Sequence, residues 1–241
     1  MKFALITGPN GFELVQEMNL GYHLVLAQHC LSSSEYLNFY IELQRKGHFI
    51  ILDNGAAEMQ HSIDFDSVLE VADVLNPDEI VMPDELGNYT ETIDQFSRYR
   101  PSVPWRKRMG VPQGENWAQW EQCLIEMLDA GVHSIGVAKR YEGFDGGRAR
   151  ALQMLKPDVV THVPVHLLGC YKKPFEEVRN IADLHYWVRG VDTAAPLAHA
   201  QQRYSMYDQI GHVSYEWDEP FPHGLAKNNV EEMLRACAHH S

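Results

Sequence analysis

The sequence lacks any apolar run long enough to cross a membrane. Its 241 residues contain nothing near the roughly 18 consecutive apolar residues that a spanning helix needs. The opening residues, MKFALITGPNGF, stay apolar for only about four positions before Gly8 and Pro9, which is typical of a strand rather than a secretory signal. We therefore expect a cytoplasmic protein with no membrane partner.

Cysteines are few and scattered. Cys30, Cys123, Cys170 and Cys237 form no CxxC pair, which argues against a disulfide framework and a structural zinc site. The chain also lacks a P-loop, a GxGxxG motif and a GxSxG motif, so nothing indicates nucleotide-cofactor binding or a serine-hydrolase elbow. We expect reduced thiols, no bound metal and no cofactor.

Positive charge is also scarce, with 20 basic against 33 acidic residues and a net charge of −13. This balance argues against broad coating of nucleic acid, because phosphate binding depends on Lys and Arg. The basic residues nevertheless cluster at Arg106–Arg108, at Lys139 and Arg140, at Arg148 and Arg150, and at Lys172 and Lys173. Each cluster has two interpretations, a local phosphate groove or solvated surface pairs.

Short apolar runs recur along the whole chain. They cover residues 3–8, 23–27, 48–53, 79–84, 108–114, 133–138, 162–169 and 186–192. Most lack polar alternation, which is typical of parallel strands buried on both faces. Helix-like stretches with capping residues and terminal glycines lie between them, at 32–47, 64–76, 116–131 and 174–184.

This alternation predicts an α/β fold, a single (β/α)8 barrel of the TIM type spanning residues 1–241. The segment from about 207 to 241 reads as a C-terminal extension, with a loop and a helix near 227–238. The first helix, between Gly11 and Leu20, and the last repeat carry the weakest patterns.

Three of the expected strands end in an aspartate, namely Asp53, Asp84 and Asp192. Active sites of such barrels lie at the C-terminal strand ends, so these carboxylates should converge there. Paired carboxylates suit cleavage of a glycosidic bond. The alternative for Asp192 is a cap of the following helix, which Pro196 helps to open.

Other groupings give weaker signals. His162 and His166 lie four residues apart on one expected strand and could share a metal, although such sites usually gather more ligands. The glycine-rich stretch 143–147 could hold a phosphate or be a flexible loop. Trp105, Trp117 and Trp120 are interpreted as packing residues.

Six short motifs occur in an order that resembles the tRNA-guanine transglycosylases. The resemblance covers about residues 48–200 and is strongest to the shorter phage-type relatives that place 7-deazaguanines in DNA. The motifs are ILDNGAAE (51–58), VMPDELGN (81–88), MGVPQGEN (109–116), SIGVAKR (134–140), HLLGC (166–170) and VRGVDTAAP (188–196).

The resemblance implies a (β/α)8 barrel that exchanges guanine for a 7-deazaguanine through a covalent sugar–enzyme intermediate. Asp192 then matches the nucleophile and Asp53 the nearby acid or base. Matching the base-binding pocket are Asp84, Gln113, Gly114, the backbone around Gly136 and Val137, and Leu168 with Gly169.

Two departures from the family bear on the substrate. After Asp53 the chain reads Asn-Gly-Ala-Ala-Glu in place of Ser-Gly-Gly-aromatic-Gln, so Tyr141 or Phe144 must stack on the base or the role stays unfilled. The family's three-Cys, one-His zinc site is absent, with only Cys237 and two histidines near the C-terminus. Because that zinc site helps to position tRNA in the family, its absence makes tRNA a weaker candidate than DNA.

The expected partners are therefore guanine-containing DNA and a free 7-deazaguanine base. Lys139, Arg140, Lys172 and Lys173 follow strands at the expected mouth and are the candidates for phosphate contacts. The target nucleotide would have to leave the base stack or be unpaired. A zinc-free tRNA enzyme and a hydrolase of free 7-deazaguanine nucleosides or nucleotides are the alternatives, and the oligomeric state stays open.

Overall fold

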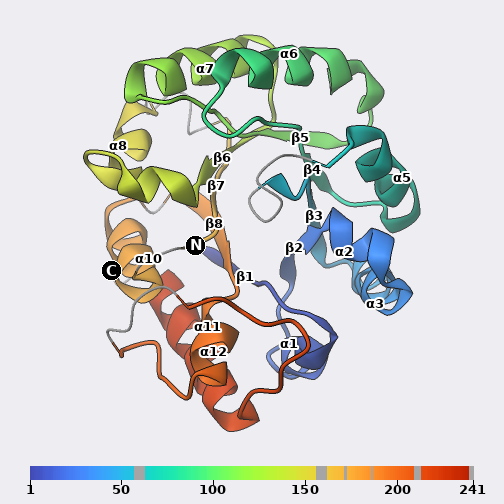
Figure 1. The fold of residues 1–241 in the computed structure, drawn as a ribbon, viewed down its shortest axis with the longest axis vertical. Coiled ribbons are helices and arrows are strands. Elements are labelled where there is room, and N and C mark those ends of the chain that lie inside the picture. Colours follow the sequence, from blue (N-terminus) through green and yellow to red (C-terminus); the bar gives the residue numbers. More distant parts are fainter. Residues whose placement is uncertain (57–62, 156–161, 171–172, 186, 209–212, 239–241) are drawn as a thin grey trace.

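Eight parallel strands form a nearly closed barrel (Figure 1). The computed structural model describes residues 1–56, 63–155, 162–170, 173–185, 187–208 and 213–238. The strands are β1 (Lys2–Leu5), β2 (Tyr22–Leu26), β3 (Phe49–Asp53), β4 (Glu79–Val81), β5 (Lys107–Gly110), β6 (Ser134–Ala138), β7 (Val165–Leu168) and β8 (Val188–Thr193). Hydrogen bonds join them in the order β1-β8-β7-β6-β5-β4-β3-β2, and β1 and β2 lie side by side at the ends of this order. The predicted (β/α)8 barrel is confirmed.

Helices surround the strands on the outside (Figure 1). They are α1 (Phe12–Glu17), α2 (Ala27–Ser32), α3 (Ser34–Arg45), α5 (Phe65–Leu75), α6 (Tyr89–Tyr99), α7 (Trp117–Asp129), α8 (Gly147–Met154), α10 (Pro174–Leu184), α11 (Ala195–Gln201) and α12 (His223–Cys237). In the described part of the chain, none is long and apolar enough to cross a membrane.

The helix expected over 32–47 is α3, which begins after a capping serine as expected, and a separate helix that was not expected precedes it. Ser33 has extended backbone angles and its hydroxyl accepts a hydrogen bond from the Tyr36 N–H, so it caps α3 and ends α2. Helix α6 was missed because its sequence is mostly polar and only Thr92 and Phe96 are buried. Helix α10 has the bounds expected from its first-turn proline.

Apolar side chains fill both faces of the barrel wall. The outer faces of the strands pack against the helices, as Ile50 and Leu52 of β3 do. The inner faces form a second cluster, made of Ala4, Ile6, Tyr22, Leu24, Leu26, Ile51, Val81, Met109 and Val111. Because both faces are buried, the strands read as nearly continuous apolar runs, as the sequence predicted.

The register between β7 and β8 shifts by one residue. Val165 pairs with Val188, but the next residue, His166, pairs with Gly190. Arg189 therefore has no residue opposite it on β7 in the strand register. Its guanidinium forms an ion pair with Glu79 of β4 inside the barrel. This shift allows a charged residue to enter the interior without interrupting the outer apolar face of β8.

The C-terminal helix completes the outer layer. Helix α12 packs against α10, α11 and β1, and the N-terminal amine of Met1 donates to the carbonyl of Cys237 over 3.0 Å. The preceding segment returns to the strand ends, where the Tyr215 hydroxyl lies 3.3 Å from the Gly8 amide. The predicted extension therefore contributes to both the helical layer and the rim of the barrel.

Candidate functional site

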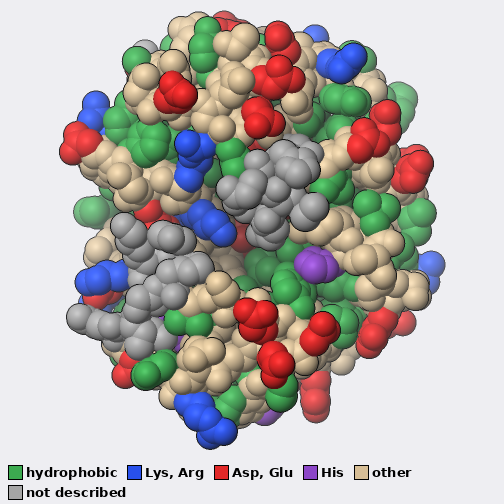
Figure 2. All heavy atoms as spheres, viewed as in Figure 1, with side chains coloured by type: hydrophobic (Ala, Val, Ile, Leu, Met, Phe, Trp, Pro, Cys, Tyr) green, Lys and Arg blue, Asp and Glu red, His purple; other side chains and the backbone are tan. Residues whose placement is uncertain are grey.

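A cavity of about 930 Å³ opens at the C-terminal ends of the strands. Asp53, Asp84 and Asp192 all line it, so the fold brings together the three strand-end aspartates. Figure 2 shows basic side chains beside the central hollow, while acidic side chains lie mostly over the surrounding helices. A volume of this size is typical of a small-molecule site.

Asp192 lies in β8 and is only 6% exposed. Its Oδ1 lies 2.9 Å from His166 Nε2 and accepts a hydrogen bond from the Gly169 N–H over 3.1 Å. Both of its hydrogen bonds to described residues end on this one oxygen, which leaves Oδ2 for a ligand. The Asp192 carboxylate is thus held in place through Oδ1 by described residues.

Asp192 does not cap the following helix. The N-cap of α11 is Ala194, and the hydroxyl of Thr193 accepts from the Ala195 N–H over 3.1 Å. The capping interpretation of Asp192 is therefore wrong, because the hydrogen bonds of its carboxylate to described residues go to His166 and Gly169 and not to α11.

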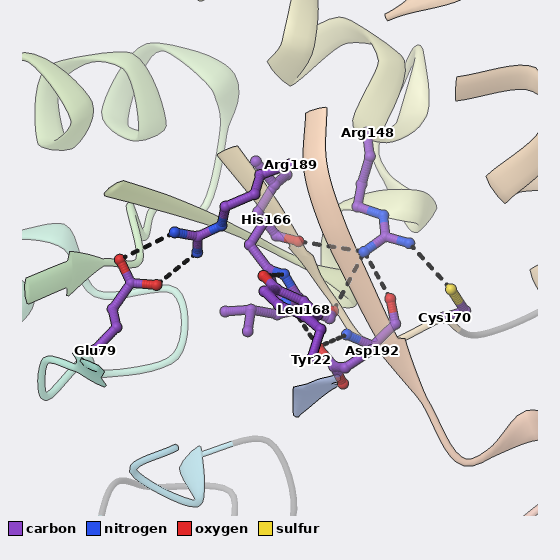
Figure 3. A network of polar contacts seen from close by, with 10 residues as sticks. Tyr22, Glu79, Arg148, His166, Leu168, Cys170, Arg189 and Asp192 are labelled. Carbon is purple, nitrogen blue, oxygen red and sulfur yellow. Dashed lines mark hydrogen bonds and ion pairs between the residues drawn. The ribbon is translucent and has the colours of Figure 1, made fainter. Parts of the chain in front are cut away.

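Arg148 holds the loop that supplies the Gly169 amide (Figure 3). Its guanidinium donates to the carbonyl oxygens of Val137, Leu168 and Gly169 at 3.2, 3.2 and 2.7 Å. It also forms a two-point ion pair with Glu177 of α10, at 2.8 and 2.6 Å. Arg148 is only 1% exposed, and its hydrogen bonds join β6, β7 and α10. Its interpretation as a solvated surface residue is therefore wrong.

Asp53 and Asn54 form the next wall of the cavity. Asp53 Oδ2 accepts from the Gly55 N–H over 2.9 Å, and Gly55 has a φ of +77°, which glycine adopts without strain. The Asn54 amide donates to the Met82 carbonyl and to Asp84 Oδ1, each over 2.7 Å. Asn54 therefore links the ends of β3 and β4.

Asp84 is enclosed by amide donors. Besides Asn54, Gln113 Nε2 donates to its Oδ2 over 2.6 Å. Burial raises the pKa of Asp84 to about 6, although both amide hydrogen bonds act to lower it. With a pKa of about 6, this carboxyl group is partly protonated just below neutral pH.

This raised pKa predicts a specific pH dependence of stability. A buried acid that prefers its neutral form stabilises the fold at low pH, and that contribution is lost as the pH rises from 3.8 through about 6. Relative to Asp84→Asn, the wild-type free energy of unfolding should therefore fall by about 1 kcal/mol between pH 5 and 7.5. Urea denaturation of both proteins at several pH values measures it, and exposed Asp94→Asn is the control. A difference that is flat or rises with pH would contradict the prediction.

Two cations follow β6 and lie on different sides of the mouth. A Cβ built on Gly169 would lie 2.8 Å from Lys139 Cδ, so the Lys139 side chain covers the loop that holds Asp192. A Cβ on Gly87 would lie 3.0 Å from both terminal nitrogens of Arg140, so Arg140 covers the loop after β4. Both cations line the cavity and are partly exposed.

Several residues expected at the site lie elsewhere. Gln113 is fully buried behind Asp84, and Val137 points outward among the helix-facing residues. The described lining includes Leu168 and Gly169 but not Gln113, Gly114, Gly136 or Val137. Lys173 is exposed and pairs with Glu176 at 3.0 Å, whereas Lys172 lies outside the described residues.

The proposed aromatic and metal residues also take other positions. Tyr141 is fully buried, with its hydroxyl donating to Gln113, and Phe144 packs against Tyr141 and Trp117. His162 precedes β7 rather than sharing a strand with His166. Among the described residues, no three His, Cys, Asp or Glu side chains converge as metal ligands.

The sequence interpretation missed two aromatic residues near the site. Trp217 lines the cavity and lies with its ring centroid 3.9 Å from that of His29. Tyr22 lies inside the barrel, where its hydroxyl is 2.8 Å from His166 Nδ1. No pattern in the sequence indicated that either residue lies near the site. Trp217 follows a polar stretch, and Tyr22 looks like any residue of an apolar strand.

Comparison with known proteins shows similarity of fold only. No known family and no curated protein matches the sequence. A chain of the Amycolatopsis orientalis BexX/CysO complex is similar at a TM-score of 0.57 and 11% identity, over 98% of this chain and 89% of that chain. Phosphoenolpyruvate phosphomutase from Streptomyces platensis subsp. rosaceus has a TM-score of 0.53 and 12% identity, over 80% and 75%. Oxaloacetate acetylhydrolase, solved with its product oxalate, has a TM-score of 0.53 and 10% identity, over 98% and 89%.

The expected membership of the transglycosylases is wrong. The barrel is similar to a phosphomutase and an acetylhydrolase instead, which overturns DNA base exchange, and nothing supports the zinc-free tRNA enzyme or the nucleoside hydrolase. The physical reason is that the six motifs fall at strand ends, where barrels of this type place polar loop residues whatever they catalyse. Contact of Lys139 and Arg140 with DNA stays a prediction from the sequence.

Proposed function

We propose that this protein is an enzyme of the lyase or aldolase type that acts on a small anionic carbonyl compound, with Asp192 as the general base. The observation that carries the proposal is the one-sided support of Asp192. Two donors hold Oδ1, and Oδ2 is left in a cavity whose rim carries two cations. A base must be fixed in direction yet keep one oxygen open to the proton that it removes.

The proposed chemical step is removal of a proton from the carbon next to a carbonyl group. The C–H electron pair moves into the bond between the two carbons, and the carbonyl oxygen becomes an enolate oxygen. The proton is transferred to Asp192, while the ammonium of Lys139, a lysine that lines the same cavity, stabilises the negative charge that develops on the oxygen. Asp84, with its pKa of about 6, supplies a second titrating group in the same cavity.

Charge at the mouth supports an anionic substrate. The protein as a whole carries a net charge of −13, yet Lys139 and Arg140 both lie on the wall of this cavity. A local positive potential on an acidic surface attracts anions to that place and repels them elsewhere. The two side chains diverge, so each can bind a different anionic group of one molecule.

The names of the fold neighbours suggest the chemical class. One is a phosphomutase of phosphoenolpyruvate, and another is an acetylhydrolase of oxaloacetate that was solved with oxalate. Both names denote small carboxylates, and this part of the proposal is an analogy from the fold. The cavity of about 930 Å³ has room for a substrate considerably longer than oxalate.

Deuterium exchange tests this function directly. The protein is incubated in D2O with pyruvate, 2-oxobutyrate, 2-oxoglutarate and phosphorylated 2-oxo sugar acids, and loss of the C3 proton signal is followed by 1H NMR. We expect exchange above the buffer rate for at least one compound. Absence of exchange with every compound would refute the proposed function.

Removing the cations should weaken substrate binding. Lys139→Met and Arg140→Met should each raise the KM of exchange about 10-fold, because a hydrogen bond to a charged group contributes about 1.5–3 kcal/mol. The matched control is Lys46→Met, which removes an exposed lysine at the end of α3. An unchanged KM in both site variants would mean that the anion binds elsewhere.

A further inference from the structure

A row of polar side chains crosses the interior of the barrel beneath the cavity (Figure 3). It begins with Glu79 of β4, which forms an ion pair with Arg189 at 2.5 Å and accepts from the Ser134 hydroxyl at 2.5 Å. It ends with the Tyr22 hydroxyl 2.8 Å from His166 Nδ1, and His166 Nε2 2.9 Å from Asp192 Oδ1. Glu79, Tyr22 and His166 are each no more than 4% exposed.

The position of each hydrogen in this row follows from the chemistry of its neighbours. Burial lowers the pKa of His166, so the ring is neutral and carries a single N–H, even though Asp192 acts in the opposite direction. An ionised carboxylate only accepts, so that hydrogen belongs on Nε2, facing Asp192. Nδ1 is then an acceptor, and the Tyr22 hydroxyl, whose pKa burial raises, donates to it.

Gly190 of β8 leaves room for the contact between Tyr22 and His166. A Cβ on Gly190 would lie 2.7–2.9 Å from three atoms of the Tyr22 side chain, Cε1, Cζ and the hydroxyl oxygen. The Arg189 guanidinium lies 5.9 Å from the Tyr22 ring centroid and is itself held by Glu79. The lack of a Cβ at Gly190 therefore leaves room for the Tyr22 ring, and the Arg189 guanidinium beside the ring is held in place by Glu79.

We propose that Tyr22 is a positioning residue, which fixes the single hydrogen of His166 on Nε2 and thereby keeps Asp192 Oδ1 occupied and Oδ2 open. The described lining of the cavity contains neither Tyr22 nor His166, so both act through Asp192 and not on the ligand. The inference deepens the proposed function and rests on it for the catalytic consequence alone. The placement of the hydrogen is a property of the protein without substrate.

Nitrogen NMR tests the placement of the hydrogen. The protein is labelled with 15N-histidine, and the signals of His166, one of 13 histidines, are assigned by their loss in His166→Gln. Long-range 1H–15N spectra between pH 6 and 8 should show a protonated Nε2 and an unprotonated Nδ1. A hydrogen on Nδ1, or on both nitrogens, would overturn the proposal.

Two variants then test the role of the tyrosine. In Tyr22→Phe, the Nδ1 signal should move because the ring nitrogen loses its donor, and in Gly190→Ala it should move because the methyl group displaces the Tyr22 ring. The matched control is Tyr40→Phe, which removes a buried hydroxyl from α3, beside Tyr36 and His23. An unchanged His166 spectrum in Tyr22→Phe would overturn the proposal.

The kinetic constants distinguish a positioning role of Tyr22 from a purely structural one. With a substrate from the exchange panel, Tyr22→Phe should lower kcat about 10-fold and leave KM within about 2-fold, because only the positioning of the base is affected. An equal kcat would overturn the catalytic part. If the spectra behave as expected and no compound exchanges, the proposed function fails while the positioning role of Tyr22 stands.

Discussion

Replacing Asp192 with asparagine is expected to lower deuterium exchange to about 0.1% of the wild-type rate while leaving the barrel folded. The amide oxygen of the introduced asparagine would still accept from His166 Nε2 and from the Gly169 N–H, so the local hydrogen bonds persist. An amide does not take a proton from carbon at neutral pH, however. General-base catalysis of this kind contributes about 10²- to 10⁴-fold, and the loss should fall in this range.

Three measurements make the result specific. Circular dichroism and urea denaturation should match the wild type, and calorimetry should show that Asp192→Asn still binds the compound that the wild type exchanges. Asp94→Asn on the exposed face of α6 makes the same chemical change away from the cavity and should exchange normally. Exchange by Asp192→Asn within about threefold of wild type would assign the base to another group, and Asp53→Asn would then be tested.

Replacing Arg148 with methionine is expected to destabilise the protein by about 3 kcal/mol, because it removes the buried member of an ion pair and leaves Glu177, whose side chain is only 18% exposed, without its counter-charge. Glu177 would lose both of its hydrogen bonds to the guanidinium, and the carbonyls of Leu168 and Gly169 would lose a donor. Urea denaturation at pH 7 measures the change. Gly169 should also shift, so exchange should fall further than the loss of stability explains.

The neighbouring Arg150 provides a matched control. It lies on the same helix, is 44% exposed in its side chain, and pairs with Asp145, whose side chain is 93% exposed. Arg150→Met should therefore cost no more than about 1 kcal/mol, as exposed ion pairs usually do. The double variant Arg148→Met/Glu177→Met should recover part of the lost stability, since Glu177 then no longer leaves a charge without its partner. Only part should return, because Glu142, which lies 3.4 Å from Arg148, still loses its ion pair with the guanidinium. A loss below about 1 kcal/mol for Arg148→Met alone would contradict the buried-pair argument.

The sequence predicted the barrel because its signals are local. Apolar runs bounded by glycine, proline and capping residues mark strands and helices one at a time, and their alternation admits few folds. The same local patterns misplaced some boundaries. The short helix α2, which ends at Ser32, was not expected, and His162 lies outside the strand that was expected to include it. Helix α6 was not predicted because only Thr92 and Phe96 are buried, which leaves too few apolar positions for a helical pattern in the sequence.

The function predicted from the sequence was wrong, although the fold was right. Six strand-end motifs in order resembled one family, but a strand end carries polar residues in many barrels, and the fold neighbours are other enzymes. The sequence did not distinguish the exposed cation Arg150 from the buried Arg148, since the two lie on one helix two residues apart. Burial depends on residues far along the chain, such as Glu177.

By itself, then, the sequence determined that strands alternate with helices and that Asp53, Asp84 and Asp192 lie near the C-terminal ends of strands on one rim, because each of these follows from neighbours in the chain. Only the tertiary structure decided which oxygen of Asp192 is held. That choice needs Tyr22 of β2, His166 and Gly169 at the end of β7, and a one-residue shift in β8. These residues are separated by up to 170 positions, and hydrogen bonds of 2.8–3.1 Å between them exist only after the barrel closes.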